Sequence, residues 1–382
     1  MKNIWLLSLI ILSWSCNDVV RQQFGIINPM VYTEEKMPLS DFADDIFYIP
    51  LDPSIVIGNI NKLVVTDSCF FISTIKSELL VFDRSGKFKN KIGKIGNGPG
   101  EYRYSNNFAI DRKSRLIYLL DQKRVIVYSF NGDYVRDFSI SKYGGDIQDI
   151  SILDGKIYLF EFISFGQAKY DWLVLNTQGD SVTSKVNSVP LFKTNEGGTG
   201  SAFSSGSEII YQNLYNDTIF GINDSSFHAA YLFAKAPFRL PLNDVGKETA
   251  GFNILGMVKT PDRLWLTYFW KDSFFTSFFD SKNQKLIVLN KAVEIDYLGG
   301  GPGITNDLDG GMAFVPIYLA RTTKSQFLVS WIYTYEIKTH VASESFKNST
   351  PKYPVKKNEY EKLANHLTGN DNPVLRFAKL KN

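Results

Sequence analysis

Short runs of alternating apolar and polar residues, separated by turns rich in Asp, Asn and Gly, recur along most of the chain. The clearest run spans residues 79–91, where apolar positions lie on both sides of Asp83-Arg84-Ser85-Gly86. An Asp at the start of a turn accepts hydrogen bonds from the following backbone, and Gly permits a positive φ. The pattern therefore predicts a β-hairpin.

This turn returns at a regular spacing. Its glycine is Gly86, then Gly132, then Gly179, and these lie 46 and 47 residues apart. A second apolar unit precedes each turn, and each of these units carries one aspartate: Asp67, Asp111 and Asp154. A repeat of this length with two hairpins per unit is typical of β-propeller blades, in which each blade is a four-stranded sheet.

Looser units at residues 207–224, 260–286 and 323–332 continue the pattern and bring the number of blades to six. A ring that stays open exposes unpaired sheet edges. We therefore expect the alternating segments 44–52 and 373–381 to close the ring, with one end of the chain adding a strand to the blade of the other end.

A helical pattern stands out at residues 358–367, where apolar or aromatic residues recur at helical spacing. The sequence thus predicts an all-β fold, a six-bladed β-propeller over residues 36–382, closed by its N- and C-terminal strands and with one short helix near the C-terminus.

The N-terminus reads as an export signal. Lys2 precedes an apolar run over residues 4–12, which is too short to span a bilayer and predicts a signal peptide over residues 1–15. Cys16 follows in the position of a lipidated cysteine, although simple secretion stays an alternative. Residues 16–35 are then expected to be a lipidated tether, the only link of the protein to the membrane.

Composition excludes some classes of partner and site. Lys and Arg total 42 against 39 Asp and Glu, without a basic stripe, so we do not expect nucleic-acid binding, which needs clustered positive charge. Once the leader is removed and Cys16 is lipidated, Cys69 is the only free cysteine, so neither an intramolecular disulfide nor a cysteine zinc site is expected. We expect a monomer.

Four segments together resemble the six-bladed β-propeller lipoproteins of Bacteroidetes, relatives of the NHL-repeat propellers. They are Phe47–Leu51, the loop Gly96–Tyr102, the stretch Asn306–Gly311 and the closing Asn372–Leu375. The resemblance covers essentially the whole mature chain, and blades four and five depart from it in their degraded turns. It implies a propeller anchored in the cell envelope, on the periplasmic or surface side of the outer membrane, often among glycan-uptake or surface-binding systems.

Two loops suggest ligand chemistry. The glycines between Gly96 and Gly100 do not form a phosphate-binding loop, because no Gly-Lys-Ser/Thr enters a helix; they are expected to carry the chain from one blade to the next. Asn306, Asp307 and Asp309 place hard oxygen atoms close together and make calcium a candidate cofactor. The alternative, which the sequence favours, is a turn whose side chains bond their own backbone.

Aromatic residues are a second candidate binding feature. Trp270, Trp331 and Tyr333 lie in the aromatic strands of blades five and six and could form a platform for sugar rings or peptide side chains. The alternative is that these side chains are buried between neighbouring blades, because the sheets of a propeller are covered on both faces.

Two functional interpretations remain open. The first is a non-catalytic binding or scaffold module for a glycan, a peptide or an envelope protein. The second is a calcium-dependent propeller hydrolase or lyase with its site at the central channel. The enzyme needs two or three convergent carboxylates or histidines at the channel, whereas the binding module needs only shape and a few aromatic side chains. The sequence contains no catalytic motif that decides for the enzyme.

Overall fold

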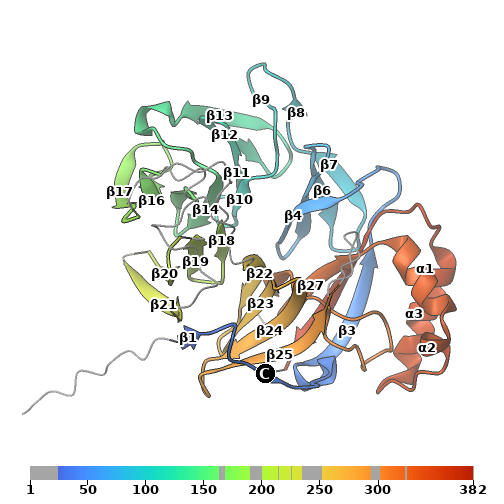
Figure 1. Ribbon diagram of the computed structural model, residues 1–382. Helices are drawn as coiled ribbons and strands as arrows, with labels where there is room; N and C mark the ends of the chain where they lie inside the picture. The colour runs from blue at the N-terminus through green and yellow to red at the C-terminus, as the bar shows by residue number, and fades with distance from the viewer. Residues whose placement is uncertain are drawn as a thin grey trace, which may run out of the picture.

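The computed structural model describes residues 25–162, 168–189, 200–213, 215–224, 226–234, 252–293, 302–322 and 325–381. Six separate sheets stand around a central axis as the blades of a propeller (Figure 1). The first strand of each blade lies innermost and the fourth lies toward the rim. The predicted all-β, six-bladed propeller is confirmed.

The blades follow the order of the chain. Blade one comprises β4 (Ile60–Val65), β5 (Cys69–Thr74), β6 (Leu79–Asp83) and β7 (Phe88–Lys91). Blade two comprises β10 (Phe108–Asp111), β11 (Leu116–Asp121), β12 (Arg124–Ser129) and β13 (Tyr134–Ser139). Blade three comprises β14 (Asp149–Leu153), β15 (Lys156–Phe160), β16 (Tyr170–Leu175) and β17 (Ser181–Val186).

The second half of the ring repeats this plan. Blade four comprises β18 (Gly200–Ser204), β19 (Ile209–Asn213), β20 (Thr218–Ile222) and β21 (Phe227–Phe233). Blade five comprises β22 (Asn253–Lys259), β23 (Arg263–Trp270), β24 (Ser273–Asp280) and β25 (Lys285–Ala292). Blade six comprises β26 (Tyr318–Arg321), β27 (Gln326–Ile332), β28 (Val374–Leu380) and β3 (Ala43–Pro50).

Blade six joins the two ends of the chain. The C-terminal β28 pairs antiparallel with β27 on one side and with the N-terminal β3 on the other, where Leu375 lies opposite Ile49. Blade six therefore contains strands from both ends of the chain, and this pairing closes the ring. The expected closure by both terminal strands is confirmed.

Residues 25–34 correct part of the expected tether over 16–35. β1 (Gly25–Ile27) pairs in parallel with β21, and β2 (Thr33–Glu34) pairs in parallel with β25. These residues pack on the blades because Ile27, fully buried, fills the core between blades four and five, and because the added strands cover two sheet edges. The signal peptide, Cys16 and the rest of residues 1–24 lie outside the described residues.

Three helices lie between β27 and β28. α3 (Pro354–His366) agrees with the predicted helix, whereas α1 (Thr334–Ala342) and α2 (Glu344–Lys347) were not expected. α1 starts where the sequence suggested a continuing strand, because Glu336 accepts a hydrogen bond from the amide of Tyr333 at 2.9 Å and so fixes the first turn. The helices pack on the outer side of blade six (Figure 1).

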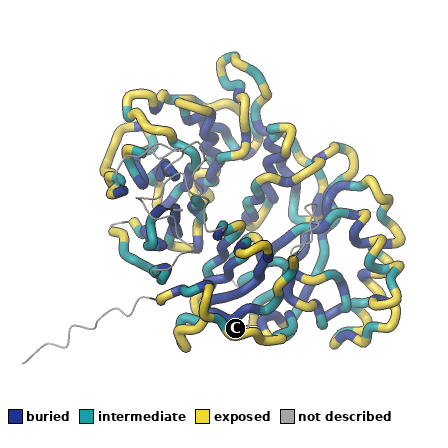
Figure 2. The backbone as a smooth tube through the Cα atoms, in the orientation of Figure 1, coloured by how far each residue is buried: buried dark blue, intermediate teal, exposed yellow. Residues whose placement is uncertain are grey.

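Six apolar cores hold the ring together, one between each pair of neighbouring blades, and a seventh lies under the helices. Buried positions accordingly follow the strands, while the loops at the rim are exposed (Figure 2). None of the helices in the described part of the chain combines the length and the apolarity needed to cross a membrane.

The repeated turn glycines are explained by the contact between neighbouring blades. Gly86 has φ +87°, and a Cβ there would lie 2.1 Å from the carbonyl oxygen of Pro50 in the preceding blade. Gly132 has φ +94°, and its Cβ would lie 2.5 Å from the carbonyl oxygen of Lys91. Each turn is thus seated on the outer strand of the blade before it, where a side chain has no room.

Candidate functional site

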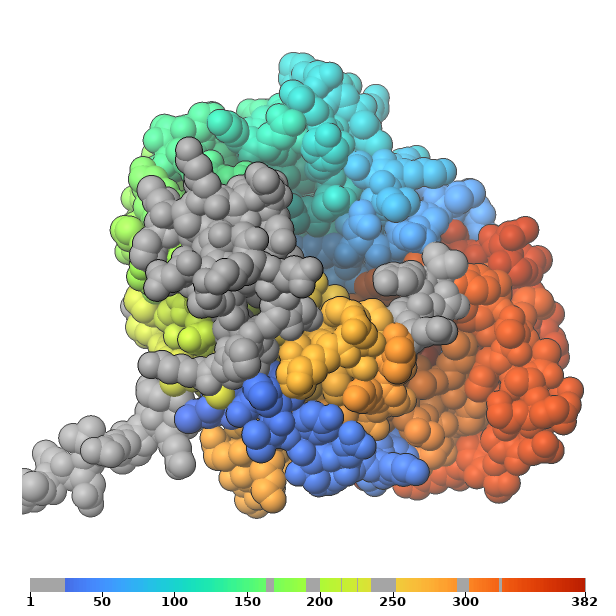
Figure 3. All heavy atoms as spheres, viewed as in Figure 1, coloured from blue at the N-terminus to red at the C-terminus, as the bar shows by residue number. Residues whose placement is uncertain are grey.

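A cavity of about 500 Å³ lies at the centre of the ring. The innermost strands and their ends in five of the six blades line it. The blades pack side by side around the ring in the order of the chain, as the colours in Figure 3 show. The walls are mainly aliphatic and aromatic, and the polar lining residues among those described are Asn61, Lys62, Arg112, Ser151, Ser204, Tyr318 and Arg321. This volume lies in the range of small-molecule sites.

The charged residues that line the cavity are all basic within the described part of the chain. Lys62 forms an ion pair with Asp149 at 3.1 Å, which joins blade one to blade three. Arg112 donates from Nη2 to the carbonyl oxygen of Val65 at 2.6 Å. The side chain of Arg321 has neither a hydrogen bond nor an ion pair with any described residue, and its Nε is buried. The cavity therefore has a positive character.

Tyr318 connects this cavity to Arg112. From blade six, its phenol reaches the backbone of Val65 in the neighbouring blade one and the side chain of Arg112 in blade two. Burial raises the pKa of Tyr318, and the nearby Arg112 opposes that rise. The phenol is consequently neutral at neutral pH and acts as a hydrogen-bonding group rather than as a charge.

Carboxylates do not converge on the cavity. The lining residues that the structure describes include no Asp, Glu or His. Elsewhere in the described residues, no group of three or more His, Cys, Asp or Glu side chains is arranged to hold a metal ion. The donor set that the enzyme interpretation requires is thus not supplied by these residues.

Several side-chain oxygen atoms of the loop proposed for calcium already accept hydrogen bonds from other groups of the protein. Asn306 donates from Nδ2 to Oδ1 of Asp309 at 2.6 Å, and the same oxygen accepts the amide of Gly311 at 2.8 Å. Asp307 accepts the amide of Ser40 at 2.9 Å. These contacts correspond to the self-bonded turn that the sequence favoured, and they also fasten the chain just before β3.

Asp309 belongs to a buried polar network under the helices. Burial raises the pKa of its carboxyl group, against the opposing hydrogen bond from Gly311. Burial, followed by the neighbouring Asp309, also raises the pKa of Tyr48 well above its usual value. Arg376, only 2% exposed, donates to Ser330 Oγ at 3.0 Å and lies near both groups. The network is a structural element of blade six.

The three aromatic candidates do not form one platform. Trp270 is buried, packs in the core between blades four and five, and carries Lys271 over its ring at 4.5 Å. Tyr333 is partly buried and stacks with Tyr335 at a centroid distance of 6.0 Å. Trp331 packs at the core between blades six and one and lines the central cavity. Of the three, only Trp331 faces the cavity.

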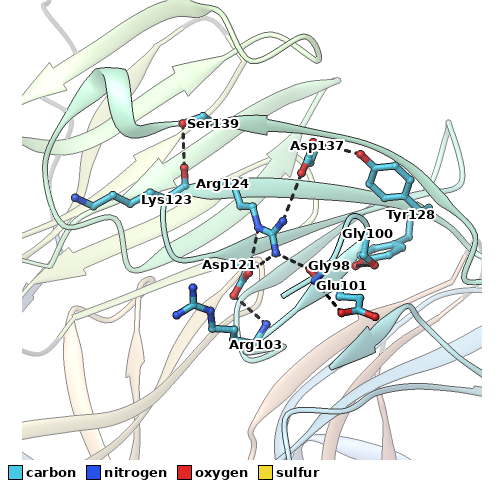
Figure 4. Close-up of polar contacts among 11 residues, drawn as sticks. Gly98, Gly100, Glu101, Arg103, Asp121, Lys123, Arg124, Tyr128, Asp137 and Ser139 are labelled. Carbon is cyan, nitrogen blue, oxygen red and sulfur yellow. Dashed lines mark hydrogen bonds and ion pairs between the residues drawn. The ribbon is translucent and has the colours of Figure 1, made fainter. Parts of the chain in front are cut away.

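The glycine-rich loop between blades one and two is fixed to blade two. It contains β8 (Lys94–Ile95) and β9 (Glu101–Tyr102), and it connects β7 to β10. Glu101 accepts the amide of Gly98 at 2.8 Å, and Tyr128 donates to the carbonyl oxygen of Gly100 at 2.9 Å (Figure 4). The amide of Gly98, which could have bound a phosphate, is therefore already bonded within the loop. Of the similar stretch 299–303, residues 299–301 lie outside the described residues.

Arg124 completes this support. It donates to the carbonyl oxygen of Glu101 at 2.6 Å and forms ion pairs with Asp121 at 3.0 Å and Asp137 at 3.5 Å (Figure 4). The positive charge of Arg124 is paired with two carboxylates of its own blade, whereas Arg321 has no such partner among the described residues.

Sequence reasoning missed the basic residues of the cavity. One signal was present: Asp111 was recognised as a repeated position at the end of an inner strand, and Arg112 follows it directly. A single arginine after a strand has no local pattern of its own, however. Only the closed ring shows that Arg112 and Arg321 line the same cavity.

The comparisons with known proteins concern the fold and the family. A family model described as a domain of unknown function, DUF4934, matches residues 25–379. A protein of Bacteroides fragilis NCTC 9343, described as exported, is similar in structure with a TM-score of 0.66 and 16% identity over 94% of this chain and 100% of that one. A member of the DUF4221 family from Bacteroides vulgatus ATCC 8482 gives a TM-score of 0.50 and 10% identity over 89% and 97%. No curated protein matches the sequence.

Proposed function

The chain belongs to the DUF4934 family, and we propose that this member is a non-catalytic binding module of the cell envelope that takes its ligand into the central cavity. The observation that carries the proposal is the cavity itself, about 500 Å³ in volume, with apolar walls, an accessible indole and basic side chains. Such a lining suits recognition of a glycan or a peptide. It offers no described carboxylate or histidine for the alternative, a calcium-dependent hydrolase or lyase.

The proposed location is outside the inner membrane. The leader over residues 1–15 and the lipidation of Cys16 would hold the propeller at the envelope through a lipid chain. A structural relative described as exported is consistent with this placement. The compact, closed ring suits a monomer that meets its ligand, or a partner protein at the rim, without further subunits.

A variant that fills the cavity tests the proposal. Ser204 is exposed and lines the cavity, so Ser204→Trp should occupy part of it. Ser184 is exposed on β17, the outer strand of blade three, and Ser184→Trp provides a matched control away from the axis. The purified protein would be screened on an array of neutral and acidic oligosaccharides and on a library of short peptides.

We expect Ser204→Trp to lose the ligands that the wild type and Ser184→Trp retain. Equal binding by all three proteins would place the ligand outside the cavity and refute the proposed site. Binding of no array member by the wild type would count against a ligand-binding role and favour a scaffold role at the rim.

A further inference from the structure

Two arginines lie at one mouth of the central cavity. Arg112 directly follows β10, and Arg321 is the last residue of β26. Both strands are the first strand of their blade, and first strands run in the same direction around a propeller. Their ends therefore lie at the same mouth, and both side chains line the cavity.

Arg321 reaches across this mouth. A Cβ placed on Gly206 would lie 2.2 Å from Nη1 of Arg321, so the guanidinium group is stacked against the first hairpin of blade four. Gly206 has φ +72° and lacks the side chain that would block this approach. The arginine thus extends from blade six past blade five, which places its charge over the opening.

The charge of Arg321 is not neutralised by the described residues. The nearest acidic residue along the chain from Gly206 is Glu208, and it is already paired with Lys259 and with His228, the latter at 3.3 Å. Arg112 bonds a carbonyl oxygen and a phenol, which leave its charge uncompensated. By contrast, Lys62, which also lines the cavity, has its own carboxylate partner in Asp149.

A guanidinium group that is partly withdrawn from water normally has hydrogen-bonding partners. Its planar donors match a carboxylate in a two-point contact. The rest of the cavity offers apolar and aromatic faces, such as Trp331, with a few hydroxyl and amide groups between them. Sugar rings present the matching combination of apolar faces and peripheral hydroxyl groups.

We propose that the mouth formed by Arg112 and Arg321 binds the carboxylate of an acidic sugar whose ring enters the central cavity. This inference rests on the proposed function, since it names the class of ligand that the cavity takes. The cavity volume of about 500 Å³ accommodates one or two sugar rings.

Cellobiouronic acid and cellobiose are suitable probes because they differ only in a carboxylate that replaces one hydroxymethyl group. Titration calorimetry at low salt should show that the acid binds at least about tenfold more tightly than the neutral sugar. Arg321→Met should reduce the affinity for the acid to that for the neutral sugar. Arg321→Lys, which keeps the charge but not the planar fork, should restore part of the affinity.

Arg103→Met is the matched control, because Arg103 is exposed on the glycine-rich loop and does not line the cavity. It should bind the acid as the wild type does. The side chain of Arg321 makes no hydrogen bond to a described residue, so Arg321→Met is expected to melt at the wild-type temperature. If it does not, Arg112→Met supplies a second removal of charge at the same mouth.

Several results would overturn the inference. They are equal affinity of the wild type for acid and neutral sugar, wild-type affinity of both arginine variants, and a dissociation constant for the acid weaker than about 1 mM. Tighter binding of glucose 6-phosphate would identify a phosphate site instead, and binding of a short peptide without the uronate would identify a peptide site. If Ser204→Trp abolishes binding while the arginine variants bind normally, the cavity remains the site and only the role of the arginines fails.

Discussion

The joint between blade one and blade six gives the most direct test of how the ring is closed. Gly86 in the β6–β7 turn lies against the end of β3, and its carbonyl oxygen accepts the amide of Asp52 at 2.9 Å. A Cβ at this position would approach the carbonyl oxygen of Pro50 to 2.1 Å, which is far inside van der Waals contact. Gly86→Ala must therefore move one blade away from the other.

The expected loss has two parts. A non-glycine residue at φ +87° costs about 1–2 kcal/mol. Relief of the clash with a backbone atom, which cannot rotate away, adds about 1–3 kcal/mol. The free energy of unfolding should therefore fall by about 2–5 kcal/mol in Gly86→Ala.

Gly155→Ala separates these two parts. Gly155 has φ +74°, but a Cβ there would meet nothing within 4 Å. This control should lose only the conformational part, about 1–2 kcal/mol. Urea unfolding of both variants and the wild type under the same conditions gives the comparison. Should Gly86→Ala unfold within about 0.5 kcal/mol of Gly155→Ala, the close contact at the joint would not be what requires glycine.

Four further results are expected. Arg376→Met should lower the free energy of unfolding by about 3–5 kcal/mol, because it leaves buried oxygen acceptors unpaired; a loss below about 1 kcal/mol in urea unfolding would contradict this. EDTA followed by calcium should leave the melting temperature unchanged, because Asp307 Oδ1 and Asp309 Oδ1 already accept hydrogen bonds from other groups of the protein, and a calcium-dependent rise would instead reveal a cation site. Burial raises the pKa of Asp309 above the usual 3.8, so the contribution of this carboxyl group to stability is lost as the pH rises through its folded pKa. The Ser85 hydroxyl lowers the pKa of Asp83 below 3.8, so the contribution of Asp83 is lost as the pH falls through its folded pKa. The stability differences of Asp309→Asn and Asp83→Asn from the wild type should accordingly change in opposite directions with pH, and parallel slopes in urea unfolding would refute the assignment. Cys16→Ser in the full chain should abolish incorporation of labelled palmitate; unchanged incorporation would contradict lipidation at this cysteine.

The parts of the fold that the sequence predicted are those with a repeated local cause. Gly86 and its equivalents recur because every blade places the same turn on its neighbour. β3 and β28 were recognisable because both alternate apolar and polar residues. β1 and β2 were not predicted, since strands of three and two residues carry too little pattern, and only the position of Ile27 in the core between blades four and five explains them.

The candidate site was harder to predict for a different reason. Aromatic residues are conspicuous in the sequence as candidate ligand-binding groups, but most of them are buried in the six cores between blades, as Trp270 is. The calcium loop was conspicuous because its oxygen-bearing residues are adjacent, and this adjacency is what lets Asn306 and Asp309 bond each other. Arg112 and Arg321 are far apart in the chain and share a site only because the ring closes.

The distribution of charge pairs explains why ligand chemistry should concentrate at this mouth. Basic residues that hold blades together have carboxylate partners, such as Lys62 with Asp149 and Lys156 with Asp224. Arg376 is bonded to oxygen atoms of blade six and of the loop beside it. Arg321 lacks such a partner among the described residues although it lines an enclosed space. Because neither Arg112 nor Arg321 belongs to a core between blades, substitution of these two residues should change the preferred ligand while the ring stays intact.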